Sequence, residues 1–438
     1  MLANDLKLTQ NSYYAASANL QASYPTLQGD IEADVCVVGG GFAGLSAAIA
    51  LADRGYKVVV LEAHHIGFGA SGRNGGQLIA GLACEQDVIE NAIGLQAAKQ
   101  VWDMSLEALK LVHERVKRFD IQCDLTAGFM GVAVNAKKTT QLNQWLDGMA
   151  QRYGYDVERI TPNDVSQWIG SPRYHSGYYD KSGGHLHPLN YCLGLAKGAA
   201  SLGVQTFTQS AVTSLRQGET AQLTTANGLV KAKFVVLAGN MYLPEISPTL
   251  APSLNKRIMP VGTYIIATEP IDAHLAATLI PSNAAICDTN FILDYFRFSA
   301  NNAKNKPRLI YGGRVSYSAM TPYKLTGKMQ ARMAETFPQL KNTKVEYTWG
   351  GFVDITMNRA PDFGRVANNV YYLQGFSGHG VALTGLAGQL VAEAIAGQSQ
   401  RLDVFAKIKH HDFQGGKWLR TPALVLGMAW YQLRDVLG

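Results

Sequence analysis

Residues 34–62 carry a complete dinucleotide-binding pattern, which constrains the fold more than any other part of the chain. An apolar run leads directly into Gly39-Gly40-Gly41-Phe42-Ala43-Gly44, and a second apolar run follows these glycines. A third apolar run ends at Glu62, eighteen residues after Gly44. Strand, glycine turn, helix, strand and acidic residue therefore stand in the order of a βαβ unit that binds a dinucleotide.

Each glycine of this pattern has a distinct physical role. Gly39 permits the tight turn out of the strand, Gly41 lets the backbone approach a pyrophosphate, and Gly44 lets helix and strand pack closely. The helix that starts at Phe42 and Ala43 directs N–H groups and the positive end of its dipole at the phosphates.

Glu62 completes the pattern and limits the range of dinucleotides that can bind. Its carboxylate can accept hydrogen bonds from ribose hydroxyls, and its charge would repel a 2′-phosphate. The pattern by itself fits NAD as well as FAD, and a glycine-rich turn in some other α/β domain is the alternative interpretation.

Length and composition bound the class of protein. A chain of 438 residues is too long for one simple core, so we expect two domains or one elaborated domain. Hydrophobic residues make up 47% and charged residues 16%, which is typical of a globular protein. The formal net charge of +6 is spread over the chain without a dense Lys/Arg block, so nucleic-acid binding is not supported.

Cysteine usage and the chain ends predict a cytoplasmic protein. The five cysteines are far apart and show no CxxC spacing, which favours reduced residues. Residues 1–29 lack the basic region and apolar run of a signal peptide. The apolar stretch 422–431 is too short to span a bilayer, so we expect a buried or partner-facing helix and leave a membrane-surface contact open.

The hydrophobic periodicity predicts an α/β fold in which apolar strands alternate with longer aromatic strands. Helices are expected at 96–119, 139–153, 188–202, 324–337 and 381–396, and strands at 129–134, 204–207, 211–215, 221–225, 230–237, 259–268, 291–298, 309–315 and 371–374. This interleaving predicts a Rossmann-like domain that shares crossovers with an antiparallel-sheet domain, with the ligand between them.

Two further glycine-rich segments point to a flavin. The loop 67–77 can wrap a large planar ligand with backbone N–H groups, although glycine and asparagine also favour ordinary surface loops. The segment 375–380 joins a strand to a helix, so its amides and the helix dipole converge on one point. Such a site stabilises the negative charge that hydride transfer leaves on a flavin ring, although an ordinary helix cap has the same pattern.

These three segments resemble those of the D-amino-acid oxidase/glycine oxidase superfamily of FAD-dependent amine oxidoreductases. The resemblance runs nearly end to end. Within the superfamily the chain most resembles bacterial enzymes of putrescine catabolism that act on a gamma-glutamylated amine. The segments that carry this narrower resemblance are 12–19, 182–190, 337–340 and 415–435.

The resemblance implies a cofactor site residue by residue. Besides the residues of 39–44 and Glu62, it implies contacts along the phosphates and the flavin ring from Ser71, Arg73, Asn74, Gly75 and Gly76, at the adenine from Val212, over the cofactor from Ala238 and Gly239, and at the ring from Gly378, His379 and Gly380. It also implies a discontinuous FAD-binding domain of 1–85, 186–255 and 350–400, a substrate domain of 86–185 and 256–349, and a C-terminal extension of 401–438.

The chain departs from relatives of this superfamily at positions that bear on the chemistry. No cysteine occurs in 345–359, where some relatives attach FAD, so we expect non-covalent FAD. Residues 381–383 lack the lysine that holds a small substrate's carboxylate, which disfavours a small amino acid. The strand at 309–311 also lacks an oxygen-activating lysine, although Lys306 and Arg308 precede it, so the electron acceptor stays open.

Polar residues outside the glycine segments are candidates for the substrate. On the strand at 291–298, Arg297 could hold a carboxylate and Asp294 an ammonium group, with Tyr295 between them, although charged residues also occur on the exposed face of ordinary strands. His379 is the candidate polar group near the ring unless only its backbone matters. The pairs His185/His187 and His410/His411 lack a third ligand at a recognisable spacing, so we expect structural histidines and no metal.

The expected reaction is FAD-dependent oxidation of the terminal amine of a gamma-glutamylated putrescine. Hydride passes to the flavin, and the imine hydrolyses to an aldehyde and ammonia. Oxygen then reoxidises the flavin and gives hydrogen peroxide. The alternatives are a flavin dehydrogenase with another acceptor, a flavin monooxygenase that consumes a nicotinamide, and a non-catalytic dinucleotide-binding protein.

Overall fold

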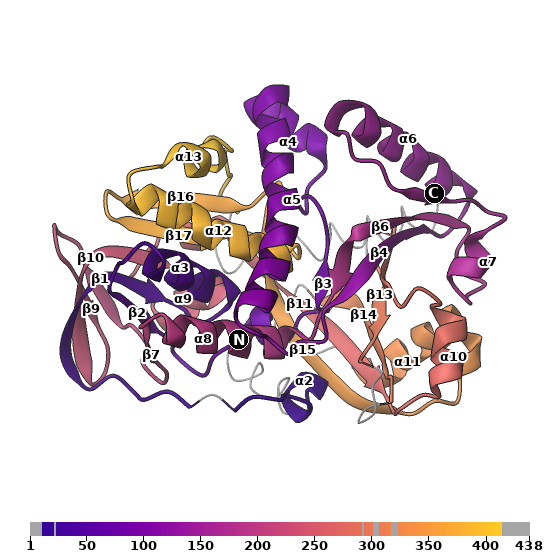
Figure 1. Cartoon of the computed structure of the whole chain (residues 1–438), viewed down its shortest axis with the longest axis horizontal. Coiled ribbons are helices and arrows are strands. Elements are labelled where there is room, and N and C mark those ends of the chain that lie inside the picture. Colours follow the sequence, from indigo (N-terminus) through magenta and orange to yellow (C-terminus); the bar gives the residue numbers. More distant parts are fainter. Residues whose placement is uncertain (1–10, 22, 291–292, 301–305, 317–322, 414–438) are drawn as a thin grey trace.

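The computed structural model describes residues 11–21, 23–290, 293–300, 306–316 and 323–413. Two sheets lie side by side, and the long helix α5 (Leu95–Arg118) runs between the two halves (Figure 1). The fold is the α/β arrangement that the sequence predicts, because strands of the two sheets alternate along the chain.

The first sheet has eight strands, and its centre is parallel. The path is β16-β17-β10-β1-β2-β7, with β9 and β8 continuing from β10. Its strands are β1 (Gly29–Val38), β2 (Val58–Leu61), β7 (Gln205–Phe207), β8 (Ser214–Arg216), β9 (Ala221–Thr224), β10 (Gly228–Leu237), β16 (Asp362–Ala367) and β17 (Val370–Gln374). The parallel strands β1, β2, β10 and β17 end near one another, which is where ligands bind in such sheets.

The second sheet has nine strands and is mixed rather than purely antiparallel. Its path is β15-β11-β14-β13-β12-β4-β6-β3, with β5 beside β6, and the β12–β4 pair is parallel. Its strands are β3 (Gln77–Leu78), β4 (Thr126–Ala133), β5 (Glu158–Ile160), β6 (Ser176–His185), β11 (Ile258–Thr268), β12 (Ala285–Asp288), β13 (Tyr295–Phe298), β14 (Leu309–Ser316) and β15 (Val345–Thr356). The second sheet is therefore antiparallel, as expected, at every pair except β12–β4.

Apolar helices form the core of the first half. The helix α3 (Phe42–Ala52) buries every residue except its last, because the sheet, α8 (Pro188–Ser201) and α12 (Gly380–Ile395) pack around it. A Cβ on Gly388 would lie 2.4 Å from the Ala47 nitrogen, so this glycine allows α12 to cross α3 at close range. Each buried Leu or Ile side chain contributes about 1.5–3 kcal/mol here.

The remaining helices are shorter or cover the outer faces. They are α2 (Tyr13–Ala16), α4 (Gln86–Ile93), α6 (Ala136–Tyr153), α7 (Val165–Trp168), α9 (Leu243–Ile246), α10 (Ala273–Leu279), α11 (Leu325–Thr336) and α13 (Gln400–Ala406). In Figure 1, α10 and α11 lie on one side of the second sheet and α6 on the other. The 3₁₀ helix η2 (Asn240–Tyr242) leads directly into α9.

Most predicted elements form close to their predicted bounds, and the exceptions have physical reasons. The strand expected at 211–215 forms only as β8, and of the strand expected at 291–298 the structure describes β13. The sequence did not predict β15, because Gly350 and Gly351 in its centre weaken strand propensity. A Cβ on Gly350 would lie 2.8 Å from the Tyr264 ring, which explains why glycine stands there.

The expected domain ranges follow the two sheets with three differences. The strand β3 and the second half of β15 fall within the ranges expected for the FAD-binding domain but belong to the second sheet. Helix α5, expected in the substrate domain, buries residues such as Val101, Leu109 and Val112 in the core that α3 and α12 share. The domain boundaries themselves stay a prediction.

Two sequence expectations concern membranes and the C-terminus. Among the described residues, no single helix has the length and apolar composition for a membrane span. Only α12 and α13 taken together meet that test, and they bend by 117° at their junction. The predicted helix at 422–431 and the resemblance segment 415–435 lie outside the described residues.

Candidate cofactor site

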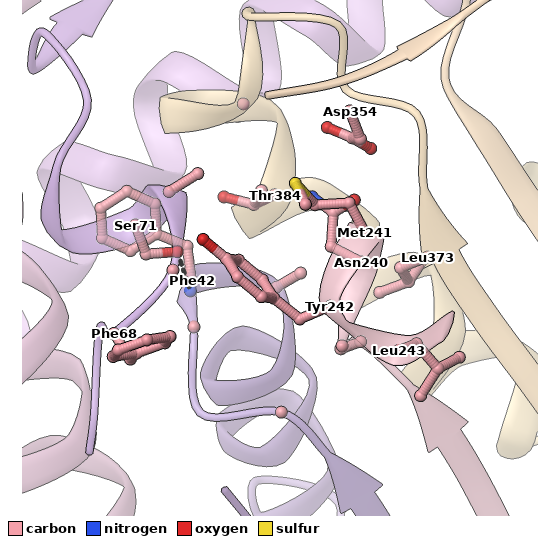
Figure 2. Close-up of a pocket in the computed structure, with 18 of the residues that line it drawn as sticks. Phe42, Phe68, Ser71, Asn240, Met241, Tyr242, Leu243, Asp354, Leu373 and Thr384 are labelled. Carbon is pink, nitrogen blue, oxygen red and sulfur yellow. Dashed lines mark hydrogen bonds between the residues drawn. The ribbon is translucent and has the colours of Figure 1, made fainter. Parts of the chain in front are cut away.

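A cavity of about 1220 Å³, part of it open to solvent, lies where β1 and β10 end and where β15 reaches the first sheet (Figure 2). Twelve of the predicted cofactor residues line it, namely Gly39, Gly41, Phe42, Ala43, Glu62, Ser71, Asn74, Val212, Ala238, Gly239, Gly378 and Gly380. The three glycine segments, distant in sequence, therefore meet around one space.

Two glycines of the first segment stand where no side chain fits. Gly39 has a φ of +117°, and a Cβ there would lie 2.6 Å from the carbonyl oxygen of Ala238 at the end of β10. A Cβ on Gly44 would lie 2.0 Å from the Gly39 oxygen. The turn after β1 can therefore contact both its own helix and the neighbouring strand, which brings α3 to the cavity wall.

The N-terminus of α3 has the features of an anion-binding site. Its N-cap residue, Gly41, offers no side-chain cap, and the Phe42 N–H donates to the Ser71 hydroxyl at 2.9 Å (Figure 2). No lysine or arginine is among the described residues that line the cavity. A pyrophosphate here would therefore be held by backbone N–H groups and the helix dipole rather than by cationic side chains.

Glu62 is fixed by backbone groups at the end of β2. One carboxylate oxygen accepts from the Gly40 N–H at 2.6 Å and the other from the His64 N–H at 2.8 Å. Burial raises the pKa of Glu62, and these N–H bonds oppose the rise. The carboxylate lines the cavity, so its remaining lone pairs can accept hydrogen bonds from ribose hydroxyls.

Asp354 of β15 holds the third glycine segment, and the sequence analysis missed it. One of its oxygens accepts from the N–H groups of Gly375 and Phe376, and its backbone oxygen accepts from the Ser377 N–H. The side chain is 3% exposed, and this burial raises the pKa of Asp354 to about 6 despite an opposing hydrogen bond from Asn240. No motif marks this aspartate, since it lies in a strand that the sequence did not predict.

The residues after β10 also line the cavity. Asn240, Met241 and Tyr242 follow the predicted Ala238-Gly239 turn, and Figure 2 shows the Tyr242 ring reaching across the cavity toward Ser71 and Phe42. The ring packs against Gly69, where a Cβ would lie 3.1 Å from it, and against Phe68. Their position directly after Gly239 is the one sequence signal that could have identified them.

Five predicted cofactor residues do not line this cavity. Gly44 lies behind the turn, while Arg73 donates to the Phe68 carbonyl at 2.7 Å and stacks on the Phe68 ring. Gly75 and Gly76 pack against β13, where Cβ atoms would meet Tyr295 and Arg297 at 2.9 Å. Contact of these residues with the cofactor stays a prediction.

His379 is the fifth of these residues and is the N-cap of α12, where its side chain caps no N–H. Part of its surface is open, yet protein atoms crowd the ring. Burial and, second, the Arg359 cation lower the pKa of His379 to about 4. The imidazole is therefore neutral near pH 7.

The three substrate candidates already have protein partners. Arg297 donates to four oxygens of the protein. Asp294 is fully buried and pairs with Arg332 at 2.5 Å and Arg173 at 3.2 Å. Tyr295 lies half-buried against Gly75 and hydrogen-bonds Thr263. These contacts give Arg297 and Asp294 structural partners, and substrate binding by Arg297, Asp294 and Tyr295 stays a prediction.

The histidine pairs have structural surroundings. The His185 ring contacts the Asn283 oxygen at 2.8 Å, and the His187 ring accepts from the Asn190 N–H at the start of α8. His410 lies 4.0 Å from Asp362. Among the described residues, no group of three or more His, Cys, Asp or Glu side chains could hold a metal ion.

A dinucleotide cavity between a sheet with a parallel centre and a second, mixed sheet is typical of flavoprotein oxidoreductases. The family model described as "DAO: FAD dependent oxidoreductase" matches residues 34–394. The chain belongs to this family and is an FAD-dependent enzyme. The glycine turn, the N-terminus of α3 and the fixed carboxylate of Glu62 are the features that fit FAD.

Curated relatives match along almost their whole length. The chain is 44% identical to "Gamma-glutamylputrescine oxidoreductase" of Escherichia coli (strain K12), over 98% of this chain and 99% of that protein. It is 40% identical to "Probable oxidoreductase OrdL" of Haemophilus influenzae, over 97% of both. These relatives confirm the superfamily that the sequence motifs indicated.

Solved structures confirm the fold. Glycine oxidase from Geobacillus kaustophilus superposes with a TM-score of 0.69 at 20% identity, covering 84% of this chain and 95% of that one. L-Proline dehydrogenase from P. horikoshii gives 0.68 at 21% identity, covering 87% and 96%.

Proposed function

We propose that this enzyme oxidises the terminal amine of gamma-glutamylputrescine to the aldehyde and releases ammonia and hydrogen peroxide, as a step of putrescine catabolism. The observation that carries this proposal is the 44% identity to the Escherichia coli enzyme of that name over nearly all of both chains. Such coverage includes the second sheet and the N-terminal segment as well as the cofactor motifs.

The cavity supports the chemistry through shape and charge. FAD, when bound, supplies the acceptor for a hydride from the carbon that carries the amine. The start of α12, whose N-cap side chain leaves its first N–H groups uncapped, directs positive potential toward Gly378 and Gly380 at the cavity wall. Apolar side chains such as Phe352 and Leu373 exclude water from the same space.

The surroundings of α12 support an amine without an adjacent carboxylate. The helix begins Gly380-Val381-Ala382-Leu383, so its own first turn offers no cationic side chain that could hold the carboxylate of a small amino acid. In gamma-glutamylputrescine the carboxylate lies far from the reacting amine, at the other end of the molecule. We therefore expect free glycine and sarcosine to be poor substrates.

Non-covalent FAD, oxygen as acceptor and a cytoplasmic location are parts of the same proposal. No cysteine is among the described residues that line the cavity, which supports non-covalent FAD. All five cysteines are free, which supports a reducing compartment. Oxygen is proposed because the overall reaction needs a two-electron acceptor.

The test is an amine panel assayed for peroxide under air. Purified holoenzyme should release peroxide and ammonia with gamma-glutamylputrescine, and more slowly with putrescine. The substrate assignment is refuted if another amine gives a higher kcat/KM. Bleaching of the flavin under nitrogen without peroxide under air would instead establish a dehydrogenase, and NADPH consumption would establish a monooxygenase. Acid precipitation should leave FAD in the supernatant, and a yellow pellet would refute non-covalent binding.

A further inference from the structure

Arg297 of β13 is a buried cation bonded only to neutral oxygens. Its side chain donates to the Gly75 oxygen at 2.7 Å, the Leu186 oxygen at 2.9 Å, and the Phe298 oxygen and Tyr14 hydroxyl at 3.1 Å each. The residue is 3% exposed. In the described part of the chain, no carboxylate lies within ion-pair distance of it.

Burying a charge without a counter-ion raises the free energy of the folded state, so we expect such a charge to serve a function that offsets this cost. Neighbouring groups feel its field. Burial and, second, the Arg297 cation lower the pKa values of His185 and His187 to about 3 each, so both rings are neutral and add no charge of their own. Desolvation raises the pKa of Asp124, an exposed residue, and the Arg297 cation partly opposes that rise.

Two of the four hydrogen bonds connect Arg297 to the loop 73–76, which we call the cofactor loop. One goes to Gly75 in this loop and the other to Leu186, which follows β6 and is itself hydrogen-bonded to the loop. Gly75 directly follows Asn74, which lines the cavity together with Ser71. The Gly76 oxygen accepts from the Leu186 N–H at 2.8 Å, and Arg297 bonds the Leu186 oxygen from the other side. A Cβ on Gly76 would lie 2.1 Å from the Leu186 oxygen, so only glycine fits at position 76 in this loop conformation.

A third bond connects Arg297 to the N-terminal segment. Tyr14 of α2 is fully buried, and its ring makes edge contacts with His187 and Trp349 at centroid distances of 4.9 and 5.1 Å. Trp349 in turn donates its indole N–H to the Arg73 oxygen at 3.0 Å. Tyr14 therefore contacts both residues that bond the cofactor loop here, namely Arg297, which bonds Gly75, and Trp349 of β15, which bonds Arg73.

We propose that Arg297 is a positioning residue of the cofactor site. It fixes the loop 73–76 in the conformation that binds FAD, and its uncompensated charge stabilises the extra negative charge of the reduced cofactor. Tyr14 is its auxiliary partner, so the described N-terminal residues 11–21 belong to the site although none of them lines the cavity. This inference rests on FAD binding, which the family establishes, and is independent of the amine proposed above.

Substitutions separate the positional role from the charge. Arg297→Met removes both, Arg297→Lys keeps the charge but cannot reach four acceptors, and Tyr14→Phe removes one acceptor alone. The readouts are the FAD dissociation constant of deflavinated protein and the midpoint potential of the reconstituted enzyme. A purely structural arginine would change the first and leave the second unaltered.

Arg308 and Tyr13 provide matched controls. Arg308 bonds the Thr268 oxygen at 2.6 Å, pairs with Glu346 and stacks near the Tyr13 ring, and none of these contacts is with the cofactor loop. Arg308→Met and Tyr13→Phe therefore remove an arginine and a tyrosine hydroxyl from the same region without touching the loop. Both variants should keep the affinity and the potential of the unmodified enzyme.

We expect Arg297→Met to bind FAD at least about tenfold more weakly, the factor set by one lost charge-assisted bond, and to have a lower midpoint potential. Arg297→Lys should lose affinity but keep most of the potential, and Tyr14→Phe should lose affinity a few-fold. Unchanged affinity and potential in Arg297→Met would overturn the proposal. Equal potentials in the Lys and Met variants would overturn its charge component. If the Met variant does not fold, unchanged affinity in both remaining variants overturns it.

Discussion

Asp354 offers a direct test of how burial and charge act in the cofactor site. Its carboxyl is nearly inaccessible, and burial raises its pKa to about 6 from the 3.8 that is usual for an aspartate. A carboxyl whose pKa is higher in the folded than in the unfolded chain stabilises the fold when protonated. That stabilisation is complete below the unfolded pKa and is lost as the pH rises through about 6.

The size of the effect follows from the two pKa values. Between pH 5 and pH 8, ionisation of Asp354 should cost the folded enzyme about 1.4 kcal/mol. For a chain of this length, that free energy corresponds to about 1.5 °C in the unfolding midpoint. Asp354→Asn keeps an oxygen that can accept from the N–H groups of Gly375 and Phe376 but cannot ionise, so this part of the pH dependence should vanish.

The assay compares midpoints of thermal unfolding at pH 5 and pH 8 with saturating FAD. Relative to the unmodified enzyme, Asp354→Asn should gain about 1.5 °C at pH 8 over its value at pH 5. Other buried carboxyls such as Asp288, whose pKa burial raises to about 7, contribute equally to both proteins and cancel.

Asp272 is the matched control for this experiment. Its carboxylate also accepts two backbone N–H bonds, from His274 and Leu275 at the start of α10, but the residue is exposed. Asp272→Asn should therefore show the pH dependence of the unmodified enzyme. If Asp354→Asn does the same, the carboxyl is not buried in the way the structure describes, and the reasoning fails.

Three further predictions concern the cofactor site. Gly44→Ala places a methyl group 2.0 Å from the Gly39 oxygen, so the protein should purify with little flavin by its 450 nm absorbance, whereas Gly327→Ala, which meets no atom within 4 Å, should retain it. Ser71→Ala removes the acceptor of the Phe42 N–H and should raise the FAD dissociation constant about fivefold; an unchanged constant would show that this bond does not order the site. His379→Asn should leave the shape of the kcat–pH profile between pH 6 and pH 9 unaltered, because a ring with a pKa of about 4 does not titrate there, and a lost inflection would contradict that value.

The sequence predicts those parts of the site that depend on backbone geometry. Gly39 and Gly44 stand where a side chain cannot fit, and such positions leave a motif that one chain is enough to recognise. The sequence accordingly predicts the βαβ unit, the Glu62 carboxylate and the turn at 375–380, and in the structure they meet around one cavity.

Side-chain partners formed by tertiary contacts could not be predicted in this way. Asp354 lies in β15, a strand that the sequence pattern does not predict because of its central glycines. Nothing in the sequence around Asp354 indicates that its carboxylate accepts hydrogen bonds from the N–H groups of Gly375 and Phe376. Arg297 and Asp294 looked alike as charges on one strand, yet the fold buries one among neutral oxygens and the other between two arginines. Which charges are paired is decided by helices and strands distant in sequence.

The order of strands in the first sheet also bears on how the enzyme is made. β1 pairs with β10, so Gly29 can pair with Gly228 only after about two hundred further residues have been synthesised. β10 in turn pairs with β17 near the end of the described chain. Until β10 is synthesised, one edge of the apolar strand β1 has no partner, and long-range parallel pairing of this kind forms slowly. Nascent chains that stop before β17 and α12 therefore lack part of the nucleotide site and expose apolar surface, which makes them natural clients of chaperones and proteases.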